Sequence, residues 1–390
     1  MGTKNIVELL VNLVRARSYP GVPRQEEAVA RELNSFLAAA GIHPRVIEIR
    51  EGRPNLIACV DSGRPGPHLL FCGHTDTVPP NSGSPDDLFA AREMGGRLFG
   101  RGAADMKGAL AAMAGALVAL SRPNILAAGK VSLAAVIDEE MESLGTEALI
   151  TSGVRADAAV VGEPTGNRIG IGHKGLEWMF IEFTGRSAHG STPEAGINAI
   201  SAAAYFVRLV EEELRPELER RRDPLLGLPV INLGTISGGD QPSTVAGRCS
   251  LQLDRRWVTT ETVDLVFEDL ERLLDKVRAR QPGLKTAITR APGSMATMVH
   301  GPLCIDPAHP IVQSAKKALA KLGIPSDNFT VFPAWTDGAL LSREGKIPTI
   351  IWGPGDLKYA HSPEESIDLE EVRLAADLYA AAAQDFASRR

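Results

Sequence analysis

Short apolar runs that alternate with helical patterns constrain the fold of this chain more than any other feature. Runs bounded by Gly, Pro or Asp occur at 55–60, 68–73, 131–137 and 158–162. Helical patterns lie around them, at about 5–18, 25–40, 106–121 and 143–152. Buried strands that alternate with helices are typical of a sheet covered on both faces. We therefore predict an α/β fold, a three-layer αβα domain with a largely parallel sheet.

A second pattern interrupts this alternation. Strand-like segments at 175–185, 231–239, 247–257 and 285–291 are separated by helical patterns at about 194–214 and 261–281. The order β-α-β-β-α-β is typical of a small, separately folded α+β unit. The first pattern then returns, with a helix at about 310–322, an apolar run at 348–355 and a closing helix at 369–387. We expect a discontinuous domain, 1–175 and 293–390, with 176–292 inserted.

Length and charge agree with this division and exclude some classes of function. A chain of 390 residues exceeds what one hydrophobic core usually organises. The net charge of −6 and the 5% aromatic content give no basic, aromatic surface for nucleic acid. The most basic run, Arg220–Arg222, lies within an acidic helical segment, so we interpret it as a solvated helix face.

Cysteine content and hydropathy indicate in which cellular compartment the protein is expected. The four cysteines form no CxxC pair, which suits a reducing environment. The first 18 residues have an amphipathic helical pattern with Arg15 and Arg17 inside it, unlike an export signal. We find no run that approaches the 18 or so apolar residues needed to cross a bilayer. We expect a cytoplasmic protein without membrane contact.

Polar side chains follow several of the predicted strands. In an open α/β sheet, ligands bind beyond the carboxyl ends of the strands. The residues found there are His74 and Asp76 after 68–73, Asp138, Glu139 and Glu140 after 131–137, Glu163 after 158–162, and His361 after 348–355. Asp105 lies in a loop before the 106–121 helix. Alone, each could be a surface residue or a helix cap, but together they would form a poorly compensated charge cluster that a divalent metal resolves.

The spacings of these residues suit metal-assisted hydrolysis. His74 and Asp76 share a face of an extended segment, so Asp76 can accept the ring N–H of His74. Glu139 and Glu140 point in different directions, so one can bind metal while the other takes a proton from water. Asp105 has two oxygens and can bridge two ions. The GRGAADMKG segment lacks the third glycine of a dinucleotide-binding loop, so we reject that alternative.

The motifs GHTDTV, GRGAADMKG, DEEMESLGT, GEPT and AHSPEE, in this order, resemble a known metallopeptidase family. It contains acetylornithine deacetylase, succinyl-diaminopimelate desuccinylase, aminoacylase and glutamate carboxypeptidase, and the resemblance covers nearly the whole chain. It implies a phosphorylase/hydrolase-like catalytic domain with a ferredoxin-like lid or dimerisation domain. It also implies two metal ions, with zinc expected and cobalt or manganese able to substitute.

The resemblance also assigns the ligands. His74, Asp105 and Glu163 would hold one ion, and Asp105, Glu140 and His361 would hold the other, with Asp105 bridging. Glu139 would be the general base and then the acid that protonates the leaving amine. Asp76 would orient His74, and the family has a cis peptide after its bridging aspartate, here Asp105–Met106.

The inserted unit would complete the site. In the resembling family, the residue at His189 (in GRSAHGSTPE) reaches the active site of the partner subunit and stabilises the oxyanion, which implies a homodimer. Arg256 in LDRRW matches an arginine that binds the substrate carboxylate, although the adjacent Arg255 remains an alternative. One segment departs from the family pattern: STVAGRC has Ser243 and Ala246 where many relatives have Asn and Pro. That asparagine contacts substrate in some relatives, so the departure leaves the substrate open.

We predict a hydrolase that cleaves the amide bond of an N-acyl amino acid, as acetylornithine deacetylase or succinyl-diaminopimelate desuccinylase does. The first alternative is a dipeptidase or exocarboxypeptidase of the same family. The second is a metal-binding homologue without catalysis, which intact ligands and an intact base disfavour.

Overall fold

The computed structural model describes residues 4–85, 87–291, 294, 297–327 and 329–389. The chain divides into two compact units. The first is formed by the chain up to His173, by Thr297 and Met298, and by the chain from Leu303 onward. The second is formed by the chain from Lys174 to Ala291, by Ser294 and by Val299–Pro302. The predicted boundary at 292–293 lies outside the described residues.

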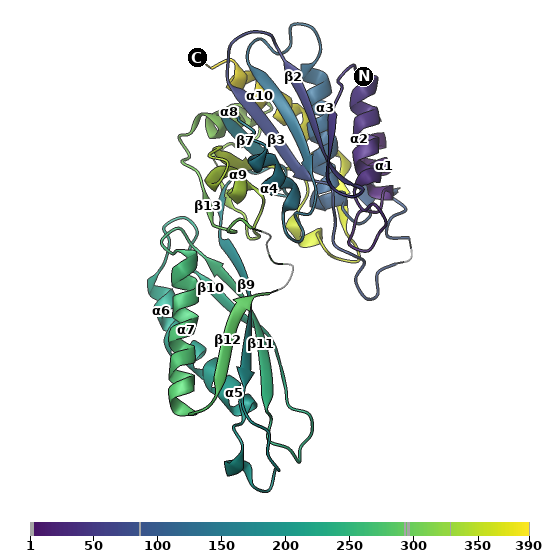
Figure 1. The fold of residues 1–390 in the computed structure, drawn as a ribbon. Helices are drawn as coiled ribbons and strands as arrows, with labels where there is room; N and C mark the ends of the chain where they lie inside the picture. Colours follow the sequence, from purple (N-terminus) through teal and green to yellow (C-terminus); the bar gives the residue numbers. More distant parts are fainter. Residues whose placement is uncertain (1–3, 86, 292–293, 295–296, 328, 390) are drawn as a thin grey trace. The chain divides into compact units, whose positions relative to one another are not determined.

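The first unit contains a nine-stranded sheet that the strand-like runs of the sequence form (Figure 1). In spatial order its strands are β1 (Arg45–Arg50), β2 (Arg53–Asp61), β6 (Lys130–Val136), β3 (His68–His74), β7 (Ala158–Val161), β15 (Thr349–Ile351), β8 (Gly170–His173) and β13 (Leu303–Cys304), with β14 (Thr330–Val331) paired to β8. The central strands β3, β6 and β7 are almost wholly buried, as expected for apolar runs covered on both faces.

The prediction of a largely parallel sheet is correct for the centre and wrong for the edges. β3 pairs in parallel with β6 and β7, and β7 pairs in parallel with β15. β1, which the sequence analysis missed, forms a tight antiparallel hairpin with β2, and β2 is antiparallel to β6. A short turn can join only antiparallel neighbours. β1 is a polar, mostly exposed edge strand, so it lacks the apolar run that marked the others.

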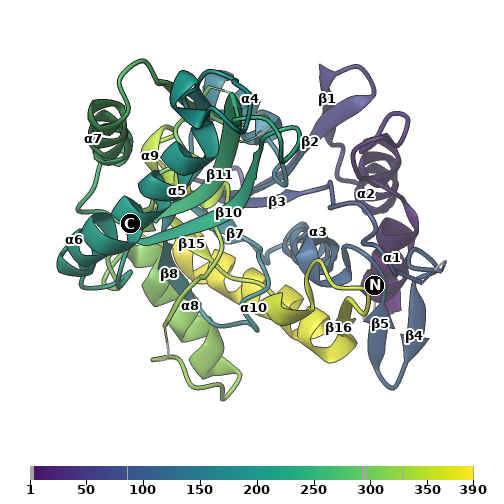
Figure 2. The ribbon, with the colours of Figure 1, turned by 90° about the horizontal axis from the view of Figure 1, so that it is seen from below.

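Helices cover both faces of this sheet, as the α/β prediction requires (Figure 2). One layer contains α3, α8 and α10, with α1 and α2 against α3, and the other contains α4 and α9. Their bounds are α1 (Lys4–Arg15), α2 (Glu27–Ala39), α3 (Gly108–Leu120), α4 (Leu144–Thr151), α8 (Pro310–Lys321), α9 (Gly338–Arg343) and α10 (Leu369–Ala387). Leu70, Cys72, Val161 and Leu341 are among the residues of one buried cluster between sheet and helices.

The expectation that no segment has the length and apolar composition of a membrane span is wrong for one helix. The segment Ala103–Leu120 is long and apolar enough to cross a membrane by length and composition. Of its residues, 94% are buried inside the protein, between α1, α2, α10 and the sheet. A core helix that is apolar all round passes the same test as a membrane span, so this segment is weak evidence for membrane insertion.

A small second sheet in the first unit was also missed by the sequence analysis. Its strands, in order, are β16 (Ser366–Asp368), β5 (Arg97–Phe99) and β4 (Arg92–Met94). Ser366 lies opposite Phe99 in the antiparallel pair β16–β5. Because each strand has only three residues, the sequence carries no periodic signal for it. The pairing nevertheless places the segments that contain Asp105 and His361 side by side.

The second unit follows the predicted β-α-β-β-α-β order. Its antiparallel sheet has the order β10 (Val230–Gly238), β11 (Arg248–Trp257), β9 (Gly175–Thr184), β12 (Lys285–Arg290). The helices α5 (Ala199–Leu209) and α7 (Val263–Arg280) pack on one face, and a buried cluster that includes Phe183, Phe206, Leu251 and Leu273 joins them to the sheet. The first helix begins at Ala199, later than predicted, because Asn198 caps its first turn.

Candidate metal centre

The residues predicted to bind metal converge at the carboxyl ends of the central strands in the first unit's sheet. The strands β3, β6 and β7 are neighbours in the sheet, so the residues that follow them come together. These residues are His74 at the end of β3, Glu139 and Glu140 after β6, Glu163 after β7, Asp105 in a π-helical segment η1 (Ala103–Lys107), and His361 after a 3-10 turn η4 (Leu357–Tyr359).

Asp105 lies between the two histidines. Its Oδ1 is 3.1 Å from His74 Nε2, and its Oδ2 is 3.3 Å from His361 Nε2. His361 Nε2 is also 3.0 Å from Glu140 Oε1, and His74 Nε2 is 3.9 Å from Glu163 Oε1. The two oxygens of one carboxylate therefore face two different histidines, as a bridging ligand requires.

Two groups of side chains could each surround one ion. The potential ligand atoms of His74, Asp105 and Glu140 lie within 4.8 Å of one another, and so do those of His74, Glu139 and Glu163. The second group includes Glu139, which the sequence analysis assigned as the base rather than as a ligand. Its nearness to the histidine is compatible with either role, and a substitution can separate the two.

The backbone around Asp105 is irregular, and packing holds it in place. The Asp105–Met106 peptide is cis, as the resemblance implied. The side chain of Met106 lies against Gly73 and Gly162, at the ends of β3 and β7. A Cβ atom would come within 2.6 Å of Met106 Cε at Gly73 and within 2.8 Å at Gly162. The two glycines thus allow Met106 to anchor the Asp105 segment directly over the strand ends.

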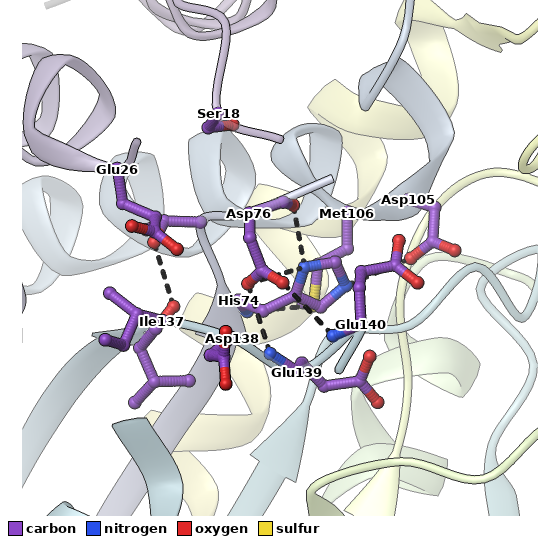
Figure 3. A network of polar contacts seen from close by, with 12 residues as sticks. Ser18, Glu26, His74, Asp76, Asp105, Met106, Ile137, Asp138, Glu139 and Glu140 are labelled. Carbon is purple, nitrogen blue, oxygen red and sulfur yellow. Dashed lines mark hydrogen bonds and ion pairs between the residues drawn. The ribbon is translucent and has the colours of Figure 1, made fainter. Parts of the chain in front are cut away.

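Asp76 plays a different part from the predicted one (Figure 3). His74 Nδ1 is 3.0 Å from the backbone oxygen of Asp76 and 3.6 Å from its carboxylate, so the carbonyl is the hydrogen-bond acceptor. The Asp76 carboxylate instead accepts the backbone N–H groups of Glu139 at 3.2 Å and Glu140 at 3.1 Å. Asp76 therefore orients both the histidine and the loop that carries the two glutamates. With Nδ1 donating, the neutral imidazole presents the lone pair of Nε2 to the cluster.

The pKa shifts of the cluster indicate that its carboxylates lack compensating positive charge. Burial raises the pKa of Glu139 and Glu163 well above the ordinary value and also raises that of Glu140, with neighbouring carboxylates adding to the effect. Hydrogen bonds to Asp105 and Glu140 raise the pKa of His361 to about 10. Burial opposes the ionised form of Asp105, but the two histidines outweigh it and keep the pKa of Asp105 low.

The pKa shifts and the ligand atoms together indicate whether the cluster could bind a divalent cation. The three glutamates and the two histidines bind protons more tightly than usual, as expected where several carboxylates are gathered away from solvent without a cation. Glu163 Oε1 is buried and has no hydrogen-bond partner among the residues that the structure describes. Oxygen and imidazole ligands with an open coordination position are a set that zinc and similar ions accept. The residues present therefore fit a divalent metal site.

In the second unit, the structure places two sequence segments side by side. His189 lies opposite Thr244 in an isolated β-bridge, and the backbone N–H of Gly190 donates to the oxygen of Ser243 at 2.7 Å. The GRSAHGSTPE segment thus pairs with the STVAGRC segment that departs from the family pattern. His189 is exposed, and its Nδ1 accepts the backbone N–H of Ser191 at 3.2 Å.

The structure also distinguishes the two candidate arginines. Arg255 has an exposed fraction of 1% and pairs with the buried Glu261. Arg256 is partly exposed and contacts Asp254, with its Nε 2.9 Å from Asp254 Oδ1. Only Arg256 has the accessibility that a substrate-binding residue requires.

Some buried polar residues near the cluster have no role predicted from the sequence. Arg53 pairs with Glu26 and Asp138, each at 2.6 Å, and so supports the loop after β6. Arg101 pairs with Glu365 at 2.6 Å behind Asp105. The only sequence signal for Glu365 was its position four residues after His361 in AHSPEE. Without a structure, the adjacent pair Glu364 and Glu365 would be interpreted as solvent-exposed.

Comparisons with known proteins identify the family of the chain. The family model described as peptidase family M20/M25/M40 matches residues 70–385. Acetylornithine deacetylase of Proteus mirabilis (strain HI4320) is 30% identical over 371 residues, covering 93% of this chain and 91% of that protein. A probable succinyl-diaminopimelate desuccinylase of Staphylococcus epidermidis (strain ATCC 12228 / FDA PCI 1200) is 26% identical over 403 residues, covering 96% and 95%.

A solved structure shows the same fold. The aminopeptidase PepT from Bacillus cereus ATCC 10987 superposes with a TM-score of 0.81 at 20% identity, with both chains fully covered. The predicted family and the α/β fold class are thereby confirmed. The match over residues 70–385, together with relatives aligned over nearly the whole chain, shows that this protein belongs to peptidase family M20/M25/M40 and is a hydrolase of amide bonds.

Proposed function

We propose that the protein is a metal-dependent deacylase that hydrolyses the amide bond of an N-acyl amino acid. The observation that carries the proposal is the Asp105 carboxylate, with one oxygen facing His74 and the other facing His361. The names of the relatives, an acetylornithine deacetylase and a probable succinyl-diaminopimelate desuccinylase, support the substrate class. Both names refer to N-acylated amino acids with a free carboxylate.

The cluster would hold two divalent ions. His74, Asp105 and Glu163 would hold one, and Asp105, Glu140 and His361 the other. Zinc is the expected metal, and cobalt or manganese can substitute in such sites. When bound, the ions would polarise the scissile carbonyl and lower the pKa of water toward about 7.

Glu139 would be the group that moves protons. Its side chain is half-buried, and desolvation raises the pKa of its carboxyl well above the usual value, which suits a group that must both accept and release a proton. The Asp76 carboxylate accepts its backbone N–H and so fixes the start of the side chain. Glu139 would take a proton from the attacking water and deliver it to the departing amine.

His189 and Arg256 would bind substrate from the inserted unit. Because Nδ1 of His189 accepts the Ser191 N–H, the neutral ring carries its proton on Nε2. That N–H is exposed and could donate to a developing oxyanion. The guanidinium of Arg256 could bind the substrate carboxylate by exchanging its contact with Asp254.

Replacing Arg256 with Gln is expected to raise KM by roughly 10–100-fold, because a charge-assisted hydrogen bond to the substrate carboxylate would be lost. Steady-state kinetics on the preferred substrate measures this effect. Arg248→Gln is a matched control, since Arg248 is an exposed arginine on the same strand that pairs with Glu182. An Arg256→Gln variant with unchanged KM contradicts the assignment.

Metal affinity is expected to increase as the pH rises from 6 to 8. His361, with a pKa of about 10 in the metal-free chain, is protonated throughout this range and must release its proton to bind an ion. Each proton released raises the apparent affinity by up to about tenfold per pH unit. Isothermal titration with zinc at several pH values, in buffers of different ionisation enthalpy, measures both quantities. An affinity independent of pH would show that the ion does not displace these protons.

The experiment that tests the proposed function is metal analysis coupled to a substrate panel. We expect about two ions per chain and hydrolysis of N-acetyl or N-succinyl amino acids. Cleavage of dipeptides alone would instead identify a dipeptidase or exocarboxypeptidase. A metal-loaded protein inert toward the whole panel would support a non-catalytic homologue.

We further propose that the protein acts in the cytoplasm as a homodimer through the inserted unit. Strand β10 is an edge strand with exposed apolar residues, Val230 and Ile236, that a second copy could cover. The chain has four cysteines and no CxxC pair, which suits a reducing compartment. Sedimentation velocity of the wild type and of an Ile236→Lys variant tests the dimer, since a charge at this interface should yield monomers.

A further inference from the structure

Glu365 is a buried carboxylate that the chemistry above does not use. Its exposed fraction is 1%, and the guanidinium that faces it, Arg101, is equally buried. Arg101 Nη1 lies 2.6 Å from Glu365 Oε2. Buried ion pairs are weak evidence for added stability, because desolvation offsets much of the attraction. The other hydrogen bonds of Glu365 and Arg101 therefore bear on the role of the pair.

The second oxygen of Glu365 holds the backbone of the proposed bridging ligand. Glu365 Oε1 accepts the N–H of Ala104 at 3.1 Å and the N–H of Asp105 at 3.2 Å. Asp105 has φ −122° and ψ 95°, outside the helical region, so a regular helix does not set the direction of its amide. The carboxylate supplies an acceptor for both amides in this buried position.

The same pair reaches the segment that contains His361. Glu365 is four residues after His361, and its own backbone oxygen accepts the N–H of Gly100 at 2.9 Å. Arg101 Nη1 also contacts the backbone oxygen of Ser362 at 3.4 Å. The adjoining pair β5–β16 continues this connection. Two loops that are far apart in the sequence are therefore tied together by one ion pair and its hydrogen bonds.

We propose that Glu365, paired with Arg101, is a positioning residue that sets the separation between Asp105 and His361 and so forms the second metal position. This inference rests on the proposed two-metal centre. Of the ligands of that position, Asp105 and His361 both depend on the pair. At the first position only Asp105 does, since His74 and Glu163 follow directly from strands. Partners that orient ligands in this way typically control metal affinity by roughly 10–100-fold.

The test is a titration of the full chain with Co²⁺, following the visible absorption that reports ligand geometry. For Glu365→Gln we expect the second ion to bind roughly 10–100-fold more weakly, with an altered spectrum, while the first ion is affected less. Glu364→Gln is the matched control, because Glu364 is the adjacent, exposed carboxylate. It should bind both ions as the wild type does.

Stability measurements separate positioning from a purely structural role. A structural defect lowers Tm equally with and without metal, whereas a positioning defect reduces the increase in Tm that Co²⁺ produces. If Glu365→Gln does not fold, Arg101→Lys takes its place under the same criteria, since lysine cannot contact Glu365 and Ser362 with one planar group. A folded variant with wild-type affinity, spectrum and metal-dependent Tm increase overturns the proposal. A wild-type chain that binds fewer than two ions would instead overturn the proposed metal centre.

Discussion

Replacing Glu139 with Gln is expected to lower kcat by roughly 10²–10⁴-fold while both ions stay bound, because the amide cannot take a proton from water. The substitution keeps the size of the side chain. It leaves in place His74, Asp105, Glu140, Glu163 and His361, so metal content should not change. Steady-state kinetics combined with metal analysis of the purified variant measures both quantities.

The metal analysis decides between the two roles that the geometry allows for Glu139. Its carboxylate lies within 4.8 Å of the potential ligand atoms of His74 and Glu163. If Glu139→Gln loses an ion along with activity, Glu139 is a ligand and the base lies elsewhere. Glu142→Gln is the control, because Glu142 is a partly exposed carboxylate in the same loop that contacts Arg50. It should retain wild-type kinetics.

Asp105→Asn is expected to abolish binding of two ions together and to reduce hydrolysis to background. An amide has one good ligand oxygen and no charge, so it cannot bridge two cations. The loss should exceed the roughly 10–100-fold effect of removing a residue that only orients a ligand. Metal titration and kinetics with zinc added back measure the effect.

The control for this substitution is Asp377→Asn, an exposed aspartate on α10. It should bind metal and hydrolyse substrate as the wild type does. An Asp105→Asn protein that still binds two ions with unchanged affinity would show that Asp105 is not the bridge. Stripping the wild type with a chelator should reproduce the loss of activity, and adding metal should reverse it.

Much of the fold followed from sequence patterns. Four apolar runs in the first half became β2, β3, β6 and β7, because short apolar runs bounded by Gly, Pro or Asp are typical of strands in the interior of a sheet. The hairpin partner β1 and the short strands β4, β5 and β16 were missed. These strands are exposed or only three residues long, and their pairing depends on partners distant in sequence rather than on local periodicity.

The difference in burial between Arg255 and Arg256 could have been predicted from the sequence. On strand β11 the buried residues Cys249, Leu251 and Leu253 alternate with polar ones. Because side chains on a strand alternate between faces, Arg255 falls on the buried face and Arg256 on the other. The role of the Asp76 carboxylate could not have been found in this way, since its partners are backbone amides of a loop 63 and 64 residues away.

The sequence by itself determined the chemistry at the strand ends: two histidines and a set of carboxylates placed after parallel strands must meet at one edge of the sheet. Only the tertiary structure decided how that edge is held. Glu365 and Arg101 are 264 residues apart, and their contact exists because β16 pairs with β5. Local patterns report burial and secondary structure, whereas a buried ion pair depends on which distant segments the fold places side by side.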